Sequence, residues 1–258
     1  MASGTSKTPF GQVYSHVYDN LYEEKNYEEE CDFLEKIFKA NGKEVKTILD
    51  LGCGTGGHAR VFTKRGYRVN GVDISESMLE IAKKKAADEN LNINFVLSSI
   101  QDFKTEEKFD AVISMFAVMG YLIENEDFSA GVRVAHNHLN EGGVFIFDGW
   151  NGFAVLNDRP GPKTKEIKNG GKRMIRKTTT DIHLFEHYVN VIFDLSVFDG
   201  EKLISETNEV HPMRFFFPQE IAFIMKQAGF KEIKFCPFLK FGEPLGENDW
   251  NLTAIAKK

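Results

Sequence analysis

The feature that most constrains the fold of this 258-residue chain is a short run that ends in closely spaced glycines. Residues 47–51 have the character of a buried strand, and Gly52, Gly54 and Gly56 follow at once. Glycine reaches positive φ values that side chains forbid, so a ligand can lie directly on such a turn. The next residues, through 64, look helical. A strand, a glycine turn and a helix in this order predict a doubly wound α/β sheet with a ligand at this turn.

Two acids narrow the choice of ligand. Glycines 52, 54 and 57 also fit the pattern G-x-G-x-x-G of dinucleotide sites. Asp73 ends the next expected strand, residues 67–73, about twenty residues after the first glycine, where an acid for ribose hydroxyls is expected. Asp50 stands just before the glycines, where it would repel a pyrophosphate bound at the helix N-terminus. S-adenosylmethionine has no phosphate and carries an ammonium and a sulfonium, so the charge pattern favours it. An Asp50 that only caps the turn is the alternative.

These motifs resemble a known family. Residues 49–56 and 71–75 are similar to the first two motifs of class I S-adenosylmethionine-dependent methyltransferases, and residues 109–113 and 139–147 to their fourth and fifth strands. Within that class the chain looks most like the N,N-dimethyltransferases of nucleotide-linked aminosugars. That narrower similarity is carried by Tyr18, Asp19, Tyr27, Met115, Phe116, Gly120, Gly149, Trp150 and residues 211–218. It implies a Rossmann-like fold with a mostly parallel sheet.

Alternating strand and helix patterns agree with a parallel α/β sheet. The expected helices are residues 27–40, 57–64, 76–87, 127–139 and 219–228, and the expected strands are 47–51, 67–73, 93–97, 111–115, 144–147, 232–237 and 250–256. Residues 153–171, which are rich in proline and glycine, read as a loop.

A second pattern interrupts this alternation. Residues 172–181, 183–199 and 202–214 alternate with a period of two, and Asp199-Gly200 is a hairpin signal. We expect one methyltransferase domain, residues 1–258, with a helical cap at 1–44. An antiparallel β insertion at 163–217 would lie over the carboxyl ends of the parallel strands, as a substrate lid or as the contact of a homodimer.

Composition excludes several classes of partner. The 32 basic and 38 acidic residues give a net charge of −6, so the whole molecule does not attract nucleic acid or anionic lipid. The cysteines at 31, 53 and 236 have neither disulfide-like nor zinc-like spacing, which suits a reducing cytosol. No signal peptide is recognised, and the longest apolar run, 111–123, is shorter than the ~20 residues of a membrane helix. A cytoplasmic enzyme is expected.

The cofactor site is expected at the carboxyl ends of the strands. Asp73 would accept both ribose hydroxyls. The family usually has Gly-Asp after the third strand, with the Asp on the adenine amino group; here Ser99 would accept that bond more weakly. The resemblance places the backbone of Met115 near the methionine ammonium and two tyrosines near its carboxylate. The expected cofactor residues are Tyr18, Tyr27, Asp50, Gly52, Gly54, Thr55, Gly56, Asp73, Ile74, Met78, Ser99, Ile100 and Met115.

Methyl transfer needs in-line positioning of a nucleophile with a free lone pair. An amine has only to arrive deprotonated, whereas an alcohol needs a general base. Tyr121 and Tyr14 are the catalytic candidates, and the related aminosugar enzymes carry His where this chain has Tyr121. A tyrosine with a pKa of ~10 is a poor base but a good hydrogen-bonding group, which favours an amine acceptor. The other possible bases are His58, His183, His187 and His211, and no cluster of acids or amides predicts a metal.

A basic segment points to the acceptor. Residues 159–177 contain only one acid, Glu166. The basic residues in this segment are Arg159, Lys163, Lys165, Lys168, Lys172, Arg173, Arg176 and Lys177. Such a cluster suits a diphosphate, to which an arginine can bind bidentately. The expected substrate residues are Trp150, Asn151, Arg173, Arg176 and Arg214. The sequence thus predicts N-methylation of a nucleotide-linked amino sugar by S-adenosylmethionine. An O- or C-methyltransferase for another small metabolite, or a catalytically silent S-adenosylmethionine-binding module, are the alternatives.

Overall fold

The computed structural model describes residues 11, 14–15, 18, 21–22, 25–169 and 171–258, and its contacts divide the chain into two compact units. The larger unit comprises Asn26–Asp158 and Arg214–Lys258, and the smaller one comprises Met1–Lys25 and Arg159–Met213. Each unit is described by itself below. Among the described residues, no helix has the length and apolar character needed to cross a membrane.

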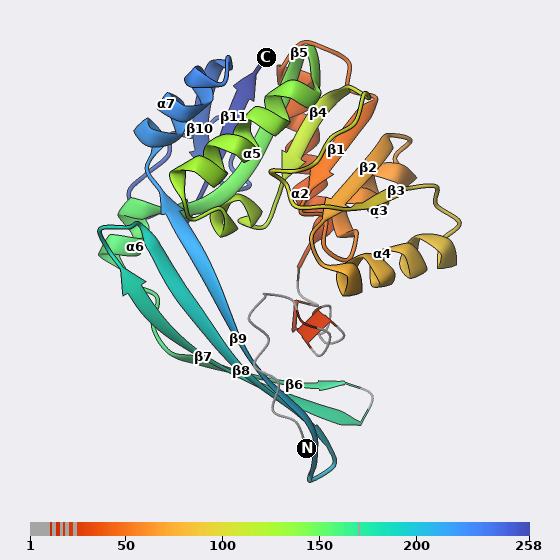
Figure 1. Cartoon of the computed structure of the whole chain (residues 1–258), viewed down its shortest axis with the longest axis vertical. Helices are drawn as coiled ribbons and strands as arrows, with labels where there is room; N and C mark the ends of the chain where they lie inside the picture. Colours follow the sequence, from red (N-terminus) through yellow and green to blue (C-terminus); the bar gives the residue numbers. More distant parts are fainter. Residues whose placement is uncertain (1–10, 12–13, 16–17, 19–20, 23–24, 170) are drawn as a thin grey trace. The chain divides into compact units, whose positions relative to one another are not determined.

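The larger unit is built on a mostly parallel sheet (Figure 1). Its strands are β1 (Thr47–Leu51), β2 (Arg68–Asp73), β3 (Asn94–Leu97), β4 (Phe109–Ser114), β5 (Leu139–Asn151), β10 (Lys231–Pro237) and β11 (Asn251–Lys257). The order β3-β2-β1-β4-β5 is parallel, β11 runs antiparallel to β5, and β10 runs antiparallel to β11. The predicted doubly wound α/β sheet is confirmed.

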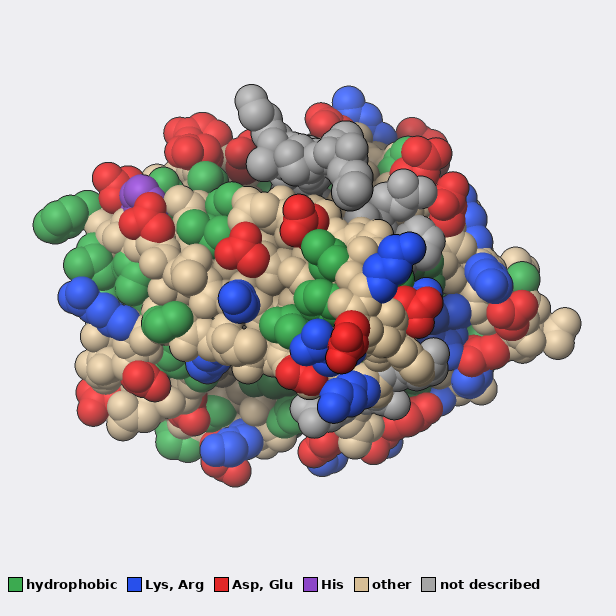
Figure 2. Space-filling model, turned by 90° about the horizontal axis from the view of Figure 1, so that it is seen from below, with side chains coloured by type: hydrophobic (Ala, Val, Ile, Leu, Met, Phe, Trp, Pro, Cys, Tyr) green, Lys and Arg blue, Asp and Glu red, His purple; other side chains and the backbone are tan. Residues whose placement is uncertain are grey.

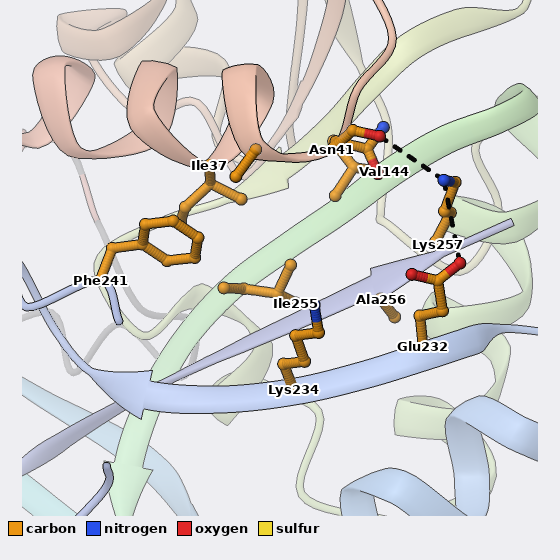
Figure 3. Close-up of a pocket in the computed structure, with 10 residues that line it drawn as sticks. Ile37, Asn41, Val144, Glu232, Lys234, Phe241, Ile255, Ala256 and Lys257 are labelled. Carbon is orange, nitrogen blue, oxygen red and sulfur yellow. Dashed lines mark hydrogen bonds and ion pairs between the residues drawn. The ribbon is translucent and has the colours of Figure 1, made fainter. Parts of the chain in front are cut away.

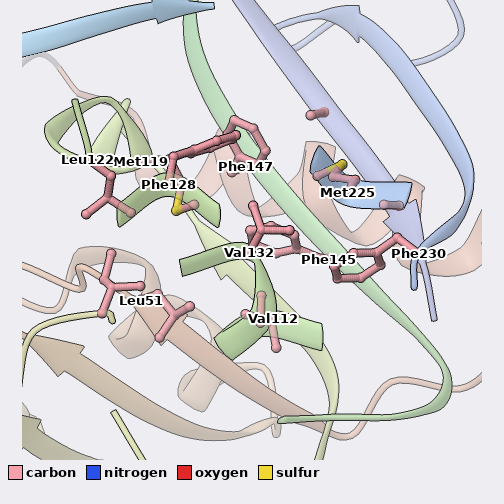
Figure 4. Close-up of a cluster of buried hydrophobic side chains, with 14 of the residues drawn as sticks. Leu51, Val112, Met119, Leu122, Phe128, Val132, Phe145, Phe147, Met225 and Phe230 are labelled. Carbon is pink, nitrogen blue, oxygen red and sulfur yellow. The ribbon is translucent and has the colours of Figure 1, made fainter. Parts of the chain in front are cut away.

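Helices cover both faces of this sheet. They are α2 (Tyr27–Ala40), α3 (Gly57–Lys64), α4 (Glu76–Asp88), η1 (Val118–Tyr121), α5 (Asn125–His138), α6 (Gly152–Asn157) and α7 (Pro218–Gln227). One buried cluster joins α5 and α7 to the sheet through Phe128, Val132 and Met225 (Figure 4). A second joins α2 and α3 to the opposite face through Leu34 and Phe62.

The alternation of β1 sets the orientation of its acid. Leu49 and Leu51 belong to the cluster under α5 and α7, whereas Ile48 belongs to the cluster under α2 and α3. Because successive side chains of a strand point to opposite faces, Asp50 lies on the same face as Ile48. The acid before the glycines is therefore buried on the α2 side of the sheet.

The smaller unit contains long antiparallel strands. β6 (Lys163–Asn169) pairs with β7 (Lys172–His183), β7 pairs with β8 (Tyr188–Asp199), and β9 (Lys202–Phe216) lies next to β8. The end of β9 belongs to the larger unit, where Phe215 and Phe216 pair with the end of β5. Apolar side chains of alternate residues are buried here: Met174, Val189, Val191, Phe193, Leu195 and Val197.

The prediction of a loop at residues 153–171 is wrong, because the structure has the helix α6 and the strand β6 in this segment. The side chain of Asn151 accepts a hydrogen bond from the backbone N–H of Phe153 (3.3 Å) and so caps α6. β6 is an edge strand whose ladder is completed by β7, so its order comes from a tertiary partner and leaves little local signal. The fifth strand is also longer than residues 144–147, since Leu139 already pairs with Phe109.

Candidate functional site

The glycine turn after β1 has the backbone that its sequence predicts. Gly52, Gly54 and Gly56 have φ values of 79°, 54° and 76°. The N–H groups of Gly52 and Cys53 donate to the carbonyl of Val72 (2.7 and 2.9 Å), which ties the turn to the end of β2. A Cβ on Gly52 would lie 2.2 Å from Cγ1 of Val118, so η1 rests directly on this turn. Only glycine fits both the conformation and the space at position 52.

Asp73 stands at the junction of the turn and the next helix. Its Oδ2 accepts from the N–H of Gly54 (2.7 Å) and its Oδ1 from the N–H of Ser75 (2.8 Å). Burial raises the pKa of Asp73, and backbone hydrogen bonds from Ser75, Gly54 and Ile74 oppose that rise. A carboxylate has about four acceptor positions, so these backbone bonds do not use up its capacity to bind a hydroxyl. The acid is placed where a ribose lying on the turn would meet it.

Asp50 lies below the turn and is buried. Burial is the main cause that raises the pKa of the Cys53 thiol, and the charge of Asp50 adds to it. Burial likewise raises the pKa of the Cys31 thiol on α2, and the charge of Asp50 adds to that rise. The carboxylate thus contributes a negative field beneath the glycines.

The loop after β3 contains an acid, Asp102, that the sequence reasoning missed. Ser99 Oγ donates to Asp102 Oδ2 (2.6 Å), and the N–H of Asp102 donates back to Ser99 Oγ (3.2 Å). Ile74 (69% exposed) follows Asp73, and Leu97 (53% exposed) pairs with Asp73 across the strands. The exposed side chains of Ile74 and Leu97, near the polar Ser99 and Asp102, suit the binding of a flat heterocyclic ring such as a nucleobase. The signal for Asp102 was its position three residues after Ser99, a spacing typical of local side-chain-to-backbone bonds.

The end of β4 is a tight, left-handed turn. Met115 is buried, and the next two residues, Phe116 and Ala117, have φ values of 72° and 57°. Asp148, on β5, accepts from the N–H of Phe116 (2.5 Å) and from the N–H of Ala117 (3.1 Å). The turn leads into η1 and its last residue, the partly exposed Tyr121. Sequence reasoning missed Asp148, whose only signal was an acid just after the strand expected at 144–147.

On the α2 side, Tyr27 packs against the start of α3. Its ring meets His58 edge-on with centroids 5.0 Å apart, and a Cβ on Gly57 would lie 2.2 Å from the Tyr27 ring. His58 Nε2 lies 2.7 Å from Glu30 Oε2, and both side chains are buried. His58 therefore joins α2 to α3, which is a packing role rather than the role of a solvent-accessible base.

Asn151 and Arg214, two of the expected substrate residues, are buried in the larger unit. Asn151 Nδ2 donates to the carbonyls of Gly246 (3.0 Å) and Asp249 (2.9 Å), in addition to capping α6. Trp150 beside it is partly exposed.

Arg214, only 4% exposed, donates to Asn125 Oδ1 (2.8 Å) and lies 3.6 Å from Glu220. Burial lowers the pKa of Arg214. Asn151 and Arg214 thus hold loops of the larger unit in place, and their roles toward a substrate stay predictions.

The remaining candidates lie in the smaller unit. Tyr14 is buried, with its hydroxyl 3.2 Å from that of Tyr22, and its ring stacks on Phe193 at 5.7 Å. Arg176 donates to the Tyr22 hydroxyl (3.0 Å), and its guanidinium lies 4.7 Å from the centroid of Phe193.

Three further residues complete this group. Tyr18 is buried against Tyr22. His211 is buried and lies 3.1 Å from Glu209. Arg173 covers the ring of Phe198 at 4.4 Å. Tyr14, Tyr18, Arg173 and Arg176 therefore share one unit, whereas the other cofactor candidates lie in the larger one.

A small open hollow lies elsewhere in the larger unit, between α2, β5, β10 and β11 (Figure 3). Ile37, Val144 and Ile255 line it, and Lys257 Nζ lies 3.8 Å from Glu232 on its rim. Val144 stands seven residues before the carboxyl end of β5, so this hollow is away from the strand ends that carry the glycine turn. The described residues contain no group of three or more His, Cys, Asp or Glu side chains arranged to hold a metal ion.

Comparison with known proteins agrees with this geometry. The methyltransferase domain family matches residues 48–143. A curated relative, the dTDP-3-amino-3,4,6-trideoxy-alpha-D-glucopyranose N,N-dimethyltransferase of Streptomyces venezuelae, is 34% identical over 139 residues, which are 53% of this chain and 57% of the relative. The putative methyltransferase YqeM of Bacillus subtilis is 26% identical over 85% of this chain and 86% of its own. The chain spans somewhat more than half the length of the dimethyltransferase that it matches.

Solved structures share the whole fold. A S-adenosylmethionine-dependent methyltransferase from Clostridium acetobutylicum superposes with a TM-score of 0.80 at 22% identity, over 95% of this chain and 97% of that one. The sugar N-methyltransferase KedS8 from Streptoalloteichus superposes with a TM-score of 0.78 at 20% identity, over 100% and 99%. Residues 48–143 therefore match a methyltransferase domain, and the chain has the fold of the class I S-adenosylmethionine-dependent methyltransferases, as its motifs predicted.

Proposed function

We propose that this protein is an enzyme that transfers a methyl group from S-adenosylmethionine to the amino group of a small, nucleotide-linked sugar. The observation that supports this most is the edge formed by four adjacent parallel strands, where the glycine turn, Asp73, Ser99 and Met115 follow the strand ends. Relatives named as dTDP-aminosugar N,N-dimethyltransferases support the choice of acceptor. The three unpaired cysteines support a reducing, cytoplasmic location.

The donor set fits this cofactor. Asp73 can bind the ribose hydroxyls while it keeps the bond from Gly54, and Ile74 and Leu97 offer apolar surface for the adenine beside Ser99. The buried carboxylate of Asp50 favours a cationic ligand over a pyrophosphate. When bound, S-adenosylmethionine supplies a methyl group already activated by its sulfonium, so the residues of this chain have to bind, orient and exclude water.

Replacing Tyr121 by phenylalanine is expected to lower kcat modestly, about tenfold, without changing the affinity for S-adenosylmethionine. A phenol that only orients an amine contributes one hydrogen bond, worth roughly 0.5–1.5 kcal/mol. The pH profile should keep its acidic limb, set by the acceptor's own amine. Steady-state kinetics across pH measure both. A loss of four orders of magnitude would instead show an obligatory proton transfer through Tyr121.

The strands β6 and β7 support a phosphate-bearing acceptor. Lys165 lies directly opposite Arg176, and Lys168 lies opposite Arg173. Like charges that face each other across strands repel, and a bound anion would relieve that repulsion. Lys165 donates to the carbonyl of Leu21 (2.8 Å) and Arg176 to the hydroxyl of Tyr22 (3.0 Å), and both acceptors are uncharged. The chain has a net charge of −6, but Figure 2 shows Lys and Arg side chains interspersed with Asp and Glu on one face of the molecule. That face therefore has no continuous acidic patch that would repel an anion.

A nucleotide-linked amino sugar should therefore be a far better acceptor than the same free sugar. Arg173→Gln is expected to raise KM for the linked form about tenfold or more, because a charge-assisted hydrogen bond is worth roughly 1.5–3 kcal/mol. Lys104→Gln, which removes an exposed charge after β3, is the matched control. Formation of S-adenosylhomocysteine measures turnover. Equal kcat/KM for the free and linked sugars would reject the nucleotide-linked acceptor while leaving the methyltransferase proposal intact.

A homodimer formed through β6–β9 stays a prediction. The antiparallel strands at 163–217 have the exposed side chains Leu203, Ile204 and Val210, which could contribute to such a contact. The net charge gives no support to a nucleic-acid or membrane partner.

A further inference from the structure

The turn after β4 combines two unfavourable features. Phe116 and Ala117 are consecutive residues with side chains in the left-handed region, each at a cost of roughly 1–2 kcal/mol. The group that holds them, the carboxylate of Asp148, is 1% exposed, and burying a charge costs free energy unless hydrogen bonds replace its water. Conformations of this kind persist only where the surroundings impose them, and they gather at functional sites.

Asp148 supplies the compensation. Its Oδ1 accepts from the N–H groups of Phe116 (2.5 Å) and Ala117 (3.1 Å), and its Oδ2 also lies 3.1 Å from the N–H of Ala117. The strand before the turn is fixed separately, because Ser114 Oγ donates to the carbonyl of Leu51 (2.8 Å) at the end of β1. The residue between these two anchors is Met115.

The conformation of the turn decides where η1 begins. The N–H of Gly120 donates to the carbonyl of Ala117 (2.9 Å), which closes η1. The methyls of Val118 then lie against Gly52 of the glycine turn, and Tyr121 ends the helix. A shift at Phe116 or Ala117 would move Val118 and Tyr121 relative to the glycine turn.

We infer that Asp148 is a positioning residue for methyl transfer, holding the left-handed turn that sets Val118 against the glycine turn and so fixes η1, which ends at Tyr121. This inference rests on the proposed function for its kinetic consequence but not for the conformation of the turn. Asp148 acts through the backbone of Phe116 and Ala117 and needs no contact with the cofactor or the acceptor. A misplacement of about 1 Å in such a site can cost about 100-fold in rate.

The test is Asp148→Asn, which keeps the shape of the side chain but replaces one acceptor oxygen by an amide group that cannot accept. We expect faster hydrogen exchange at the N–H groups of Phe116 and Ala117, and a kcat lowered about 10- to 100-fold with a smaller change in KM. Asp110→Asn is the matched control. Asp110 also accepts backbone N–H groups, from Lys46 (3.1 Å) and Thr47 (3.2 Å), but at the opposite ends of the strands. That variant should lower Tm without changing kcat.

Rescue separates a conformational role from a direct one. Ala117→Gly removes the Cβ that makes the left-handed φ costly, so the double variant Asp148→Asn/Ala117→Gly should recover most of the lost kcat. The double variant also serves if Asp148→Asn alone does not fold. A double variant that folds but stays inactive would overturn the inference, as would an Asp148→Asn protein with wild-type kcat or unchanged exchange at both amides. If the wild-type chain transfers no methyl group, the proposed function fails, and the exchange measurement still tests the role of Asp148 in the turn.

Discussion

Alanine in place of Gly52 is expected to reduce the affinity for S-adenosylmethionine at least about 100-fold. A φ of 79° costs a residue with a side chain roughly 1–2 kcal/mol, and the new Cβ would lie 2.2 Å from Val118 Cγ1. Because the overlap involves the first atoms of a branched side chain on η1, either the turn or η1 must move. Titration calorimetry with S-adenosylmethionine and with S-adenosylhomocysteine measures the loss.

Gly66→Ala is the control for this prediction. Gly66 also has a positive φ, 91°, but a Cβ there would meet nothing within 4 Å, and it lies beyond α3, away from the turn. This substitution should lower stability by roughly 1–2 kcal/mol and leave cofactor affinity unchanged. Val118→Ala in the Gly52→Ala background should recover part of the affinity by removing two methyl groups. Wild-type affinity in the Gly52→Ala protein would exclude this turn as the cofactor site.

Asp73→Ala should weaken S-adenosylmethionine binding about 10- to 100-fold, because the charge-assisted contacts to a ribose are worth roughly 1.5–3 kcal/mol. Part of the effect comes from the protein, since Asp73 also holds the N–H groups of Gly54 and Ser75. Glu80→Gln, an exposed acid on α4, is the control for loss of charge.

The same residue predicts a pH dependence. Burial raises the pKa of Asp73 in the structure, so its carboxylate begins to protonate at a higher pH than an ordinary aspartate. Only the ionised form accepts two hydroxyls, so the affinity should be full above the raised pKa and fall as the pH drops through it. Calorimetry across mildly acidic pH should show this decline in the wild type and not in Asp73→Asn. An identical pH profile in both proteins would assign the dependence to another group.

Local patterns predicted the parts of the site that lie within one strand and its turn. The strand at Thr47–Leu51, the glycine turn and the start of the helix at Glu76 depend on neighbours a few residues away, and the structure has them where the sequence placed them. The parallel order of the sheet followed from the alternation of strands and helices.

Interactions between distant residues could not be read in this way. The contact of Asp148 with Phe116 spans 32 residues, and nothing in the sequence marks Phe116 and Ala117 for a left-handed turn that usually favours glycine. The buried bonds of Asn151 to Gly246 and Asp249 span more than 90 residues, so an amide beside a strand end looked like a substrate ligand. Arg214 likewise looked like part of a basic patch, because its partner Asn125 lies 89 residues away.

The three thiols give this fold an internal set of chemical probes. Cys31 on α2, Cys53 in the glycine turn and Cys236 on β10 are all buried and unpaired. Burial raises the pKa of each thiol, that of Cys236 to about 11. Alkylating reagents attack the exposed thiolate, so the folded chain should react only when a segment opens. The labelling rate of each cysteine therefore reports the opening of its own segment. A ligand bound on the glycine turn should slow the labelling of Cys53 more than that of Cys31 or Cys236.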